Sequence, residues 1–183
     1  MNNTTSPLMP TYALLYADAE IIDIQDFLVA VRAAADRLDA HIICMNADKI
    51  AGRLHIKTAL SHACRTWFTD KNPIARSFEM EVLLWVAATR QTSVAAKFGA
   101  QKGTMPLWIV VVPAKESTTD EIDCLPSLSL YSTPPASTED INAEKKGRLM
   151  EEFSIGEAEL STVGCERLPE LVAERVALSA IYR

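Results

Sequence analysis

The run of residues from Ile74 to Ala88 limits what this chain can fold into more strongly than any other part of it. Its apolar side chains point in nearly every direction around a turn of 3.6 residues, and a helix that is apolar on all sides is a buried helix. Asn72 is a suitable N-cap for such a helix, and Pro73 fits its first position. The sequence therefore predicts a central helix that is packed on several sides.

A short second helix is predicted to follow the central one, after the turn Thr89–Gln91. Thr92 is placed to cap this second helix, and Gly99 is placed to end it in the left-handed conformation. Arg90 and Gln91 therefore lie in a tight connection between two helices, a position where functional residues often occur.

The flanking segments predict an α/β layer. Residues 11–17 and 41–45 have the composition of strands, and the continuously apolar run 106–113 predicts a strand that is buried on both faces or central in its sheet. Between the first two strands, apolar residues recur at helical spacing after Asp23 or Asp26, which are the candidate caps. Further helices are predicted from Arg53 to about Phe68, from Ser137 or Thr138 to Phe153, and from Pro169 to the C-terminus.

Together these elements predict a single α/β domain of the α+β type over residues 1–183. Its sheet is expected to be small and mostly antiparallel, with four to five strands and with the helices packed mainly on one face. Residues 1–10 are expected to form a flexible N-terminal tail. Residues 114–138, rich in Ser, Thr, Pro and acids, are expected to form an acidic loop or insertion. Within it, the run 128–131 either pairs with a sheet edge or belongs to a long mobile loop.

Charge is distributed unevenly along the chain. The net charge of −6 by itself disfavours a nucleic-acid partner. Residues 45–105, however, contain nine Lys or Arg against four Asp or Glu, a balance of +5, which leaves −11 for the remainder. This asymmetry is consistent with a basic face on an acidic body, as RNA binding requires, and also with an ordinary solvated surface.

The sequence carries no recognisable catalytic or metal-binding constellation. Its six glycines do not form a nucleotide-binding loop, and its four cysteines contain no C-x-x-C pair. His55 and His62 are seven residues apart, with no carboxylate or thiol at a metal-ligand spacing. We therefore expect no catalytic residue, metal, cofactor or enzymatic activity. The absence of a long apolar run and of a signal peptide predicts a cytoplasmic protein without a membrane partner.

Residues 72–103, NPIARSFEMEVLLWVAATRQTSVAAKFGAQKG, form a long gapless pattern. This pattern resembles the signature of the small kinase-binding subunit of the KEOPS complex, which makes threonylcarbamoyl-adenosine in tRNA. The run CMNADKIAGRLHIKTALSHA at residues 44–63 and the run ELVAERVALSAI at residues 170–181 match the same family.

The resemblance implies a non-catalytic subunit that directly binds the small atypical kinase/ATPase of that complex. The Kae-type transferase and the dimerising subunit would be reached indirectly, through the kinase. The resemblance also implies that the chain recruits tRNA by holding its single-stranded 3′ CCA end. Two other hypotheses remain open: a protein-only adaptor that regulates the kinase without contacting RNA, and a small enzyme whose site has no familiar motif.

The predicted RNA contacts lie in the matching segments. The resemblance points to Arg53, His55, Arg76 and Arg90, and local position adds the others. The full predicted set is Lys49, Arg53, His55, Lys57, Arg76, Arg90, Gln91, Lys97 and Lys102. The predicted kinase contacts lie on the C-terminal helix and are Val172, Arg175, Val176, Ser179 and Ile181.

The cations that precede the central helix have an ordinary structural alternative. Arg53, in the first turn of its helix, is placed to bind phosphate at the helix N-terminus. Lys49, Arg53 and Lys57 are spaced by four, and they form one ridge only if that helix begins before Arg53. The alternative is that their stems cover apolar surface while their charged heads stay in water.

The later cations have alternatives of their own. Arg76 either reaches a phosphate or forms an internal ion pair with Glu79, one helical turn away. Lys97 and Lys102 either contact RNA or complement the C-terminal dipole of the short helix.

Overall fold

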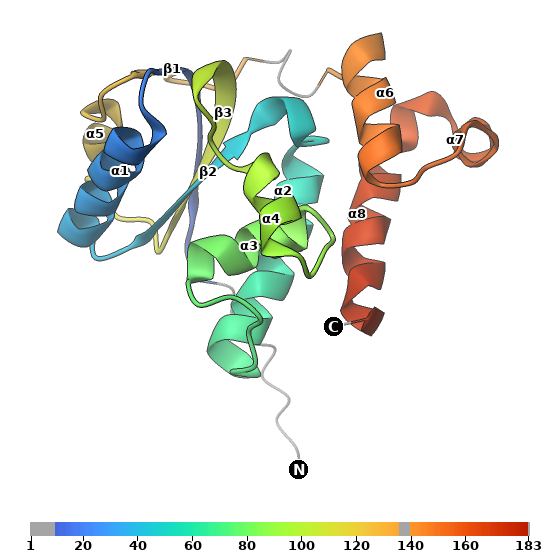
Figure 1. The fold of residues 1–183 in the computed structure, drawn as a ribbon, viewed down its shortest axis with the longest axis horizontal. Helices are drawn as coiled ribbons and strands as arrows, with labels where there is room; N and C mark the ends of the chain where they lie inside the picture. The colour runs from blue at the N-terminus through green and yellow to red at the C-terminus, as the bar shows by residue number, and fades with distance from the viewer. Residues whose placement is uncertain (1–9, 136–139, 183) are drawn as a thin grey trace.

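Four strands form one antiparallel sheet at the centre of the protein. The computed structural model describes residues 10–135 and 140–182. Within them the strands are β1 (Ala13–Ile21), β2 (His41–Asn46), β3 (Gly103–Val112) and β4 (Leu128–Leu130), in the order β2-β3-β1-β4 (Figure 1). The predicted fold class, α+β with a mostly antiparallel sheet of four to five strands, is confirmed.

Helices separate the strands and make up the chain after the last strand. They are α1 (Ile24–Leu38), α2 (Arg53–Cys64), α3 (Phe78–Val86), α4 (Thr92–Ala95), α5 (Thr118–Asp123), α6 (Ala143–Glu152), α7 (Glu157–Val163) and α8 (Leu168–Leu178). The π-type turn η2 (Arg65–Thr69) continues α2, and the 3-10 turn η6 (Ser179–Tyr182) continues α8. Further 3-10 turns are η1 (Ala47–Lys49), η3 (Ala96–Phe98) and η5 (Cys165–Arg167). Across residues 10–135 and 140–182, no helix is both long and apolar enough to cross a membrane.

Helices cover both faces of the sheet. Figure 1 shows α1 and α5 on one side and α2, α3 and α8 on the other, so that most helices lie on one face, as predicted. The α2-side core takes Trp108, Val110 and Val112 from β3, and the α1-side core takes Leu107, Ile109 and Val111. Because side chains alternate along a strand, a central strand covered on both faces must be apolar throughout. The prediction that residues 106–113 form such a strand is confirmed, since β3 lies between β2 and β1.

Helix α3 is the predicted central helix, and its apolar residues are buried on every side. It begins later than predicted, however, at Phe78 and not directly after Asn72. Ser77 is its N-cap, and residues 74–77 form bends before it. The physical reason is the carboxylate of Glu81, which binds the backbone of these bends and so competes with helix formation there.

Helix α4 is shorter than predicted and differs at both ends. Its N-cap is Gln91 and not Thr92. Gly99 is extended, with φ of −79°, and not left-handed, because it pairs with Met45 at the edge of the sheet. A Cβ atom at this position would lie 3.3 Å from Leu83. Glycine therefore serves a close approach here and not a helix stop.

The segment predicted as an acidic loop contains regular structure over its described residues. Ile122 of α5 is fully buried in the α1-side core, and Glu121 of α5 forms an ion pair of 2.8 Å with Arg37 of α1. Strand β4 pairs with β1, which confirms the alternative in which the run 128–131 joins a sheet edge. Residues 136–138, the end of this segment, lie outside the described residues, as do residues 1–9 of the predicted tail.

Other helix boundaries agree with the predictions or refine them. Asp23 is the N-cap of α1, and Gly52 is the N-cap of α2. Helix α6 starts behind Asn142, whose side chain accepts the backbone N–H of Lys145 at 2.8 Å. The predicted caps of this helix, Ser137 and Thr138, lie outside the described residues.

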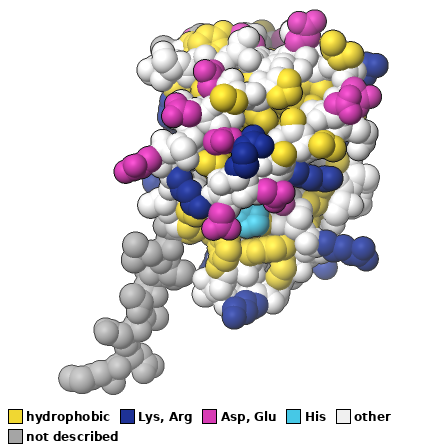
Figure 2. Space-filling model, turned by 90° about the vertical axis from the view of Figure 1, so that its left-hand side faces the viewer, with side chains coloured by type: hydrophobic (Ala, Val, Ile, Leu, Met, Phe, Trp, Pro, Cys, Tyr) yellow, Lys and Arg dark blue, Asp and Glu magenta, His cyan; other side chains and the backbone are white. Residues whose placement is uncertain are grey.

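The surface over α1 and α5 carries mixed side chains. Figure 2 shows acidic, basic and hydrophobic side chains interspersed on this face, without a continuous basic area. Val29 of α1 is 62% exposed, and such single exposed apolar residues are ordinary. This face therefore lacks the segregated positive charge that an RNA-binding surface needs.

Candidate functional site

Residues 45–105, the basic segment, have all four of their acids held by partners within the protein. Three of these acids contact a basic side chain: Asp48 contacts Arg148 at 3.8 Å, Asp70 contacts Arg65 at 3.1 Å, and Glu79 contacts His41 at 2.6 Å. The fourth acid, Glu81, is fully buried. The exposed cations of the segment include Lys57, Arg76, Arg90, Lys97 and Lys102. Cations therefore dominate the charge that this segment presents to solvent.

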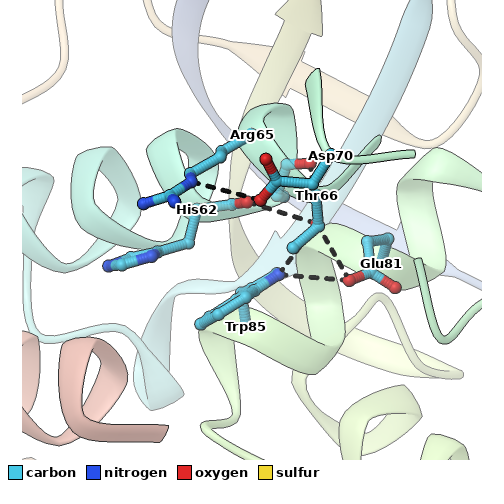
Figure 3. Close-up of polar contacts among 7 residues, drawn as sticks. His62, Arg65, Thr66, Asp70, Glu81 and Trp85 are labelled. Atoms are coloured by element: carbon cyan, nitrogen blue, oxygen red, sulfur yellow. Dashed lines mark hydrogen bonds and ion pairs between the residues drawn. The ribbon is translucent and has the colours of Figure 1, made fainter. Parts of the chain in front are cut away.

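Glu81 lies in a buried polar cluster between α2 and α3 (Figure 3). Its Oε2 atom accepts the backbone N–H groups of Ile74 at 2.9 Å and Ala75 at 3.0 Å. Its Oε1 atom accepts Nε1–H of Trp85 at 3.1 Å and the hydroxyl of Thr66 at 3.2 Å. A carboxylate that has lost its water needs such donors. Here they join α3, the end of α2 and the loop between them.

The Glu81 cluster determines where Arg76 lies. Because Glu81 holds the N–H groups of residues 74–75, the backbone just before Arg76 is fixed, and Arg76 is exposed on the bend that follows. The alternative in which Arg76 pairs with Glu79 is wrong, since Glu79 bonds to His41 of β2. Contact between Arg76 and a phosphate stays a prediction.

A surface pocket of about 420 Å³ lies at the N-terminal end of α2. It is lined by Tyr12, Leu14, Arg53, Leu54, Ile56 and Lys57. Arg53 and Lys57 are four residues apart and both are exposed. The lining thus combines two cations with a phenol ring and aliphatic side chains. Such a lining suits a ligand that has a planar body and a negative charge.

Helix α2 begins at Arg53, so the condition under which Lys49, Arg53 and Lys57 would form one ridge is not met. The guanidinium of Arg53 lies 5.4 Å from the ring centroid of Trp108, at cation–π distance. Lys49 lies in η1, before α2 begins. Its ammonium pairs with Glu152 of α6 and lies 5.0 Å from the ring centroid of Phe98. Lys49 is therefore largely engaged within the protein, whereas Arg53 and Lys57 share the pocket.

The other predicted cations of the basic segment follow α3. Lys97 lies in η3, Lys102 directly precedes β3, and both are exposed. Gln91 is exposed as well, and its backbone N–H donates to the hydroxyl of Thr89 at 3.2 Å. RNA contact by these three residues stays a prediction.

Arg90 connects the turn between α3 and α4 with the C-terminal turn η6. Its Nη1 atom donates a hydrogen bond to the backbone carbonyl of Tyr182 at 3.0 Å. This bond therefore joins a residue predicted for RNA to the turn that holds Ser179 and Ile181, two residues predicted for the kinase.

His55 is a buried structural residue, which corrects its prediction as an RNA contact. Its side chain is fully buried. Its Nδ1 atom accepts the N–H of Ala51 at 3.2 Å, and its Nε2 atom donates to the carbonyl of Val86 at 2.8 Å. This pair of bonds requires the neutral ring. Because burial disfavours the charged form, it lowers the pKa of His55 to about 4.

We expect His55 to make the protein less stable as the pH falls from 7 to 5. The unfolded chain protonates this ring near pH 6.5, whereas the folded protein does so only near pH 4. Between these values only the unfolded state binds the proton, so the free energy of unfolding should fall by about 2 kcal/mol between pH 7 and pH 5. Urea unfolding at both pH values measures this loss. The variant His55→Gln should lose correspondingly less, and an equal loss in the variant would show that another group is responsible.

Four of the five predicted kinase contacts are engaged within the protein. Val172 and Val176 are fully buried in the α2-side core, so neither can touch a partner. Their prediction is corrected because the multi-sided apolar pattern of α8 reflects packing against the body of the protein. Arg175 donates to Glu159 of α7 at 2.7 Å, and the hydroxyl of Ser179 donates to the carbonyl of Val176 at 2.7 Å.

The fifth residue, Ile181, belongs to an exposed apolar group at the end of the chain. Leu178, Ile181 and Tyr182, here called the C-terminal apolar strip, are 40%, 71% and 76% exposed. Sequence reasoning missed Leu178 and Tyr182, although their spacing of three and four residues places them on one side of a helical turn. It also missed Tyr12 in the pocket, which directly precedes β1 and packs, like Leu14, against the α2-side core.

Together these residues offer exposed cations, one pocket with an aromatic wall, and an apolar strip at the C-terminus. The cations and the pocket are candidate contacts for a negatively charged ligand, and the strip is a candidate contact for an apolar protein surface. No protein-family model matches the chain, and no curated protein is significantly similar to it in sequence.

Proposed function

We propose that this protein is a non-catalytic accessory subunit that binds tRNA and a small atypical kinase/ATPase in a KEOPS-type complex for threonylcarbamoyl-adenosine synthesis. The observation that carries the proposal is the charge arrangement of the basic segment. Its cations other than Lys49 are exposed, whereas Glu79 is paired and Glu81 is buried. This segment is also where the resemblance to the kinase-binding subunit is strongest.

The pocket at the start of α2 is the proposed place for a single-stranded RNA end. Arg53 and Lys57 supply charge for a phosphate, and Tyr12 supplies a ring on which a base can stack. Arg76 and Arg90 would add planar guanidinium groups, which can contact phosphate through two N–H groups at once. The 3′ CCA end of tRNA has this chemistry: it is single-stranded, flexible and charged.

The C-terminal apolar strip is the proposed contact for the kinase. Its three side chains are exposed although they are apolar, and they follow directly on the buried part of α8. A partner that covers them would gain apolar contact area without any rearrangement of the core. The transferase and the dimerising subunit would then be reached through the kinase, in the cytoplasm.

Intact tRNA should bind the isolated protein with an affinity that falls as salt is raised. A few phosphate contacts give a log–log slope of about −2 to −3 for a single strand. Removing the CCA end should abolish most of the affinity, because stacking and end contacts are lost with it. Arg53→Ala and Arg90→Ala should each weaken binding several-fold. Fluorescence anisotropy with end-labelled tRNA measures all of these effects.

Lys115→Ala is the matched control, because Lys115 is a cation outside the basic segment that pairs with Asp39 at the end of α1. It should leave tRNA affinity unchanged. Equal binding of intact and trimmed tRNA, together with unaffected arginine variants, would rule out the RNA role and leave the protein-only adaptor and the small enzyme. Affinity purification from the native cell then separates the remaining cases. The tRNA-binding subunit and the protein-only adaptor both require the kinase to co-purify, whereas the small enzyme does not.

A further inference from the structure

Arg90 is held at its base, and among the described residues its guanidinium has one hydrogen-bond partner. The turn that carries it is fixed to the buried helix α3, since Ala87 and Thr89 donate backbone hydrogen bonds of 2.9 and 3.0 Å to Leu83 and Leu84. A guanidinium has five N–H groups. Within the part of the chain that the structure describes, Tyr182 is its hydrogen-bond partner, through Nη1. The remaining N–H groups are therefore available for a phosphate or a base while that bond persists.

The acceptor of this bond sits in a weakly held part of the chain. Ile181 and Tyr182 are 71% and 76% exposed, so few contacts of their own side chains fix the turn η6. Segments with few buried contacts open at low free-energy cost. The Tyr182 carbonyl, which accepts the Arg90 hydrogen bond, thus lies in a turn that a bound partner can order.

We infer that Arg90 couples the two binding surfaces, so that a protein partner on the C-terminal apolar strip strengthens RNA binding at Arg90, and RNA strengthens the binding of that partner. The inference rests on the proposed function, because it needs both ligands. A partner that covers Ile181 and Tyr182 orders the carbonyl that holds the guanidinium, so RNA no longer has to order this side chain itself. Because coupling is reciprocal, both affinities change by the same factor.

The test measures tRNA affinity with and without a saturating concentration of the kinase, using the full-length chain. Through one ordered side chain, the kinase should tighten tRNA binding by about three- to tenfold. Any RNA contacts that the kinase itself makes are the same for every variant. The ratio of the tRNA affinities with and without the kinase is therefore also measured for Arg90→Ala. The ratio for the unaltered protein should exceed the ratio for Arg90→Ala by this factor.

Lys97→Ala is the matched control, because Lys97 is an exposed cation of the same segment. It should lower tRNA affinity but leave the ratio unchanged, whereas Arg90→Lys, which keeps the charge but not the planar fork, should reduce the ratio. If both ligands bind and Arg90→Ala has the same ratio as the unaltered protein, or if the kinase weakens tRNA binding, the coupling is refuted while the proposed function stands. If neither ligand binds the unaltered protein, the proposed function fails and the coupling with it.

Discussion

Replacing Glu81 by Ala should lower the free energy of unfolding by about 3–4 kcal/mol, because it removes the shared acceptor of several buried or part-buried donors. Two of these donors are the backbone N–H groups of Ile74 and Ala75, which cannot turn away to find water. The third is the indole N–H of the almost fully buried Trp85, which keeps a longer contact of 3.4 Å to the hydroxyl oxygen of Thr66. Urea unfolding followed by circular dichroism measures the change.

Two further variants make this prediction specific. Glu81→Gln keeps the shape of the side chain but replaces one acceptor oxygen by an NH₂ donor. Either the two backbone N–H groups or the Trp85 and Thr66 donors then lose their acceptor on residue 81, at a cost of about 1–3 kcal/mol. Glu79→Ala removes a carboxylate from the same helix that is 37% exposed and bonded to His41, and it should cost about 1 kcal/mol or less. A Glu81→Ala protein as stable as the Glu79→Ala protein would contradict the account of the cluster.

Ile181→Arg should abolish the complex with the kinase and leave the fold intact. The side chain is 71% exposed, so an arginine there stays solvated in the free protein and should change the free energy of unfolding by less than about 0.5 kcal/mol. In the complex the same charge would be buried without a partner, which should raise the Kd about 100-fold or more. Calorimetric titration with the kinase, together with a thermal melt of the variant, measures both effects.

Val29→Arg is the control for this experiment, since Val29 is an exposed valine on the opposite side of the sheet. It should leave the kinase affinity unchanged. Val176→Glu, in contrast, places a charge at a fully buried position and should unfold the protein, so a loss of binding by that variant says nothing of the interface. Normal kinase binding by a folded Ile181→Arg protein would show that the C-terminal apolar strip is not the contact.

The parts of the fold that depend on local pattern could be predicted from the sequence. Strand β3 is apolar from Met105 to Val112 because helices cover both of its faces, and that pattern is visible in residues 106–113 alone. Helix α3 is apolar all round for the same kind of reason. Its first turn could not be predicted, because the choice between a helix and bends at residues 74–77 depends on the buried carboxylate of Glu81. Composition alone places a glutamate on the surface.

The candidate site was less accessible to sequence reasoning, because it depends on contacts between distant segments. The apolar residues of α8 cover more than one face, and only packing against α2 separates the buried Val176 from the exposed Ile181. The bond between Arg90 and Tyr182 joins residues that are 92 positions apart. His55 likewise shares a helix with Arg53 and Lys57, but its side chain points inward. A list of polar residues in a matching segment cannot distinguish these cases.

The alternation of side chains along β3 also has a consequence for how this protein can change during evolution. Trp108 and Val110 face the α2 side of the sheet, which holds the pocket and the C-terminal apolar strip, whereas Ile109 and Val111 face α1 and α5, which carry none of the proposed contacts. Substitutions on the α1 side can therefore accumulate and compensate one another within a separate compartment, provided that they preserve its apolar volume. The two sides of one sheet can thus diverge in sequence at different rates, because substitutions on the α1 side leave the binding surfaces unchanged.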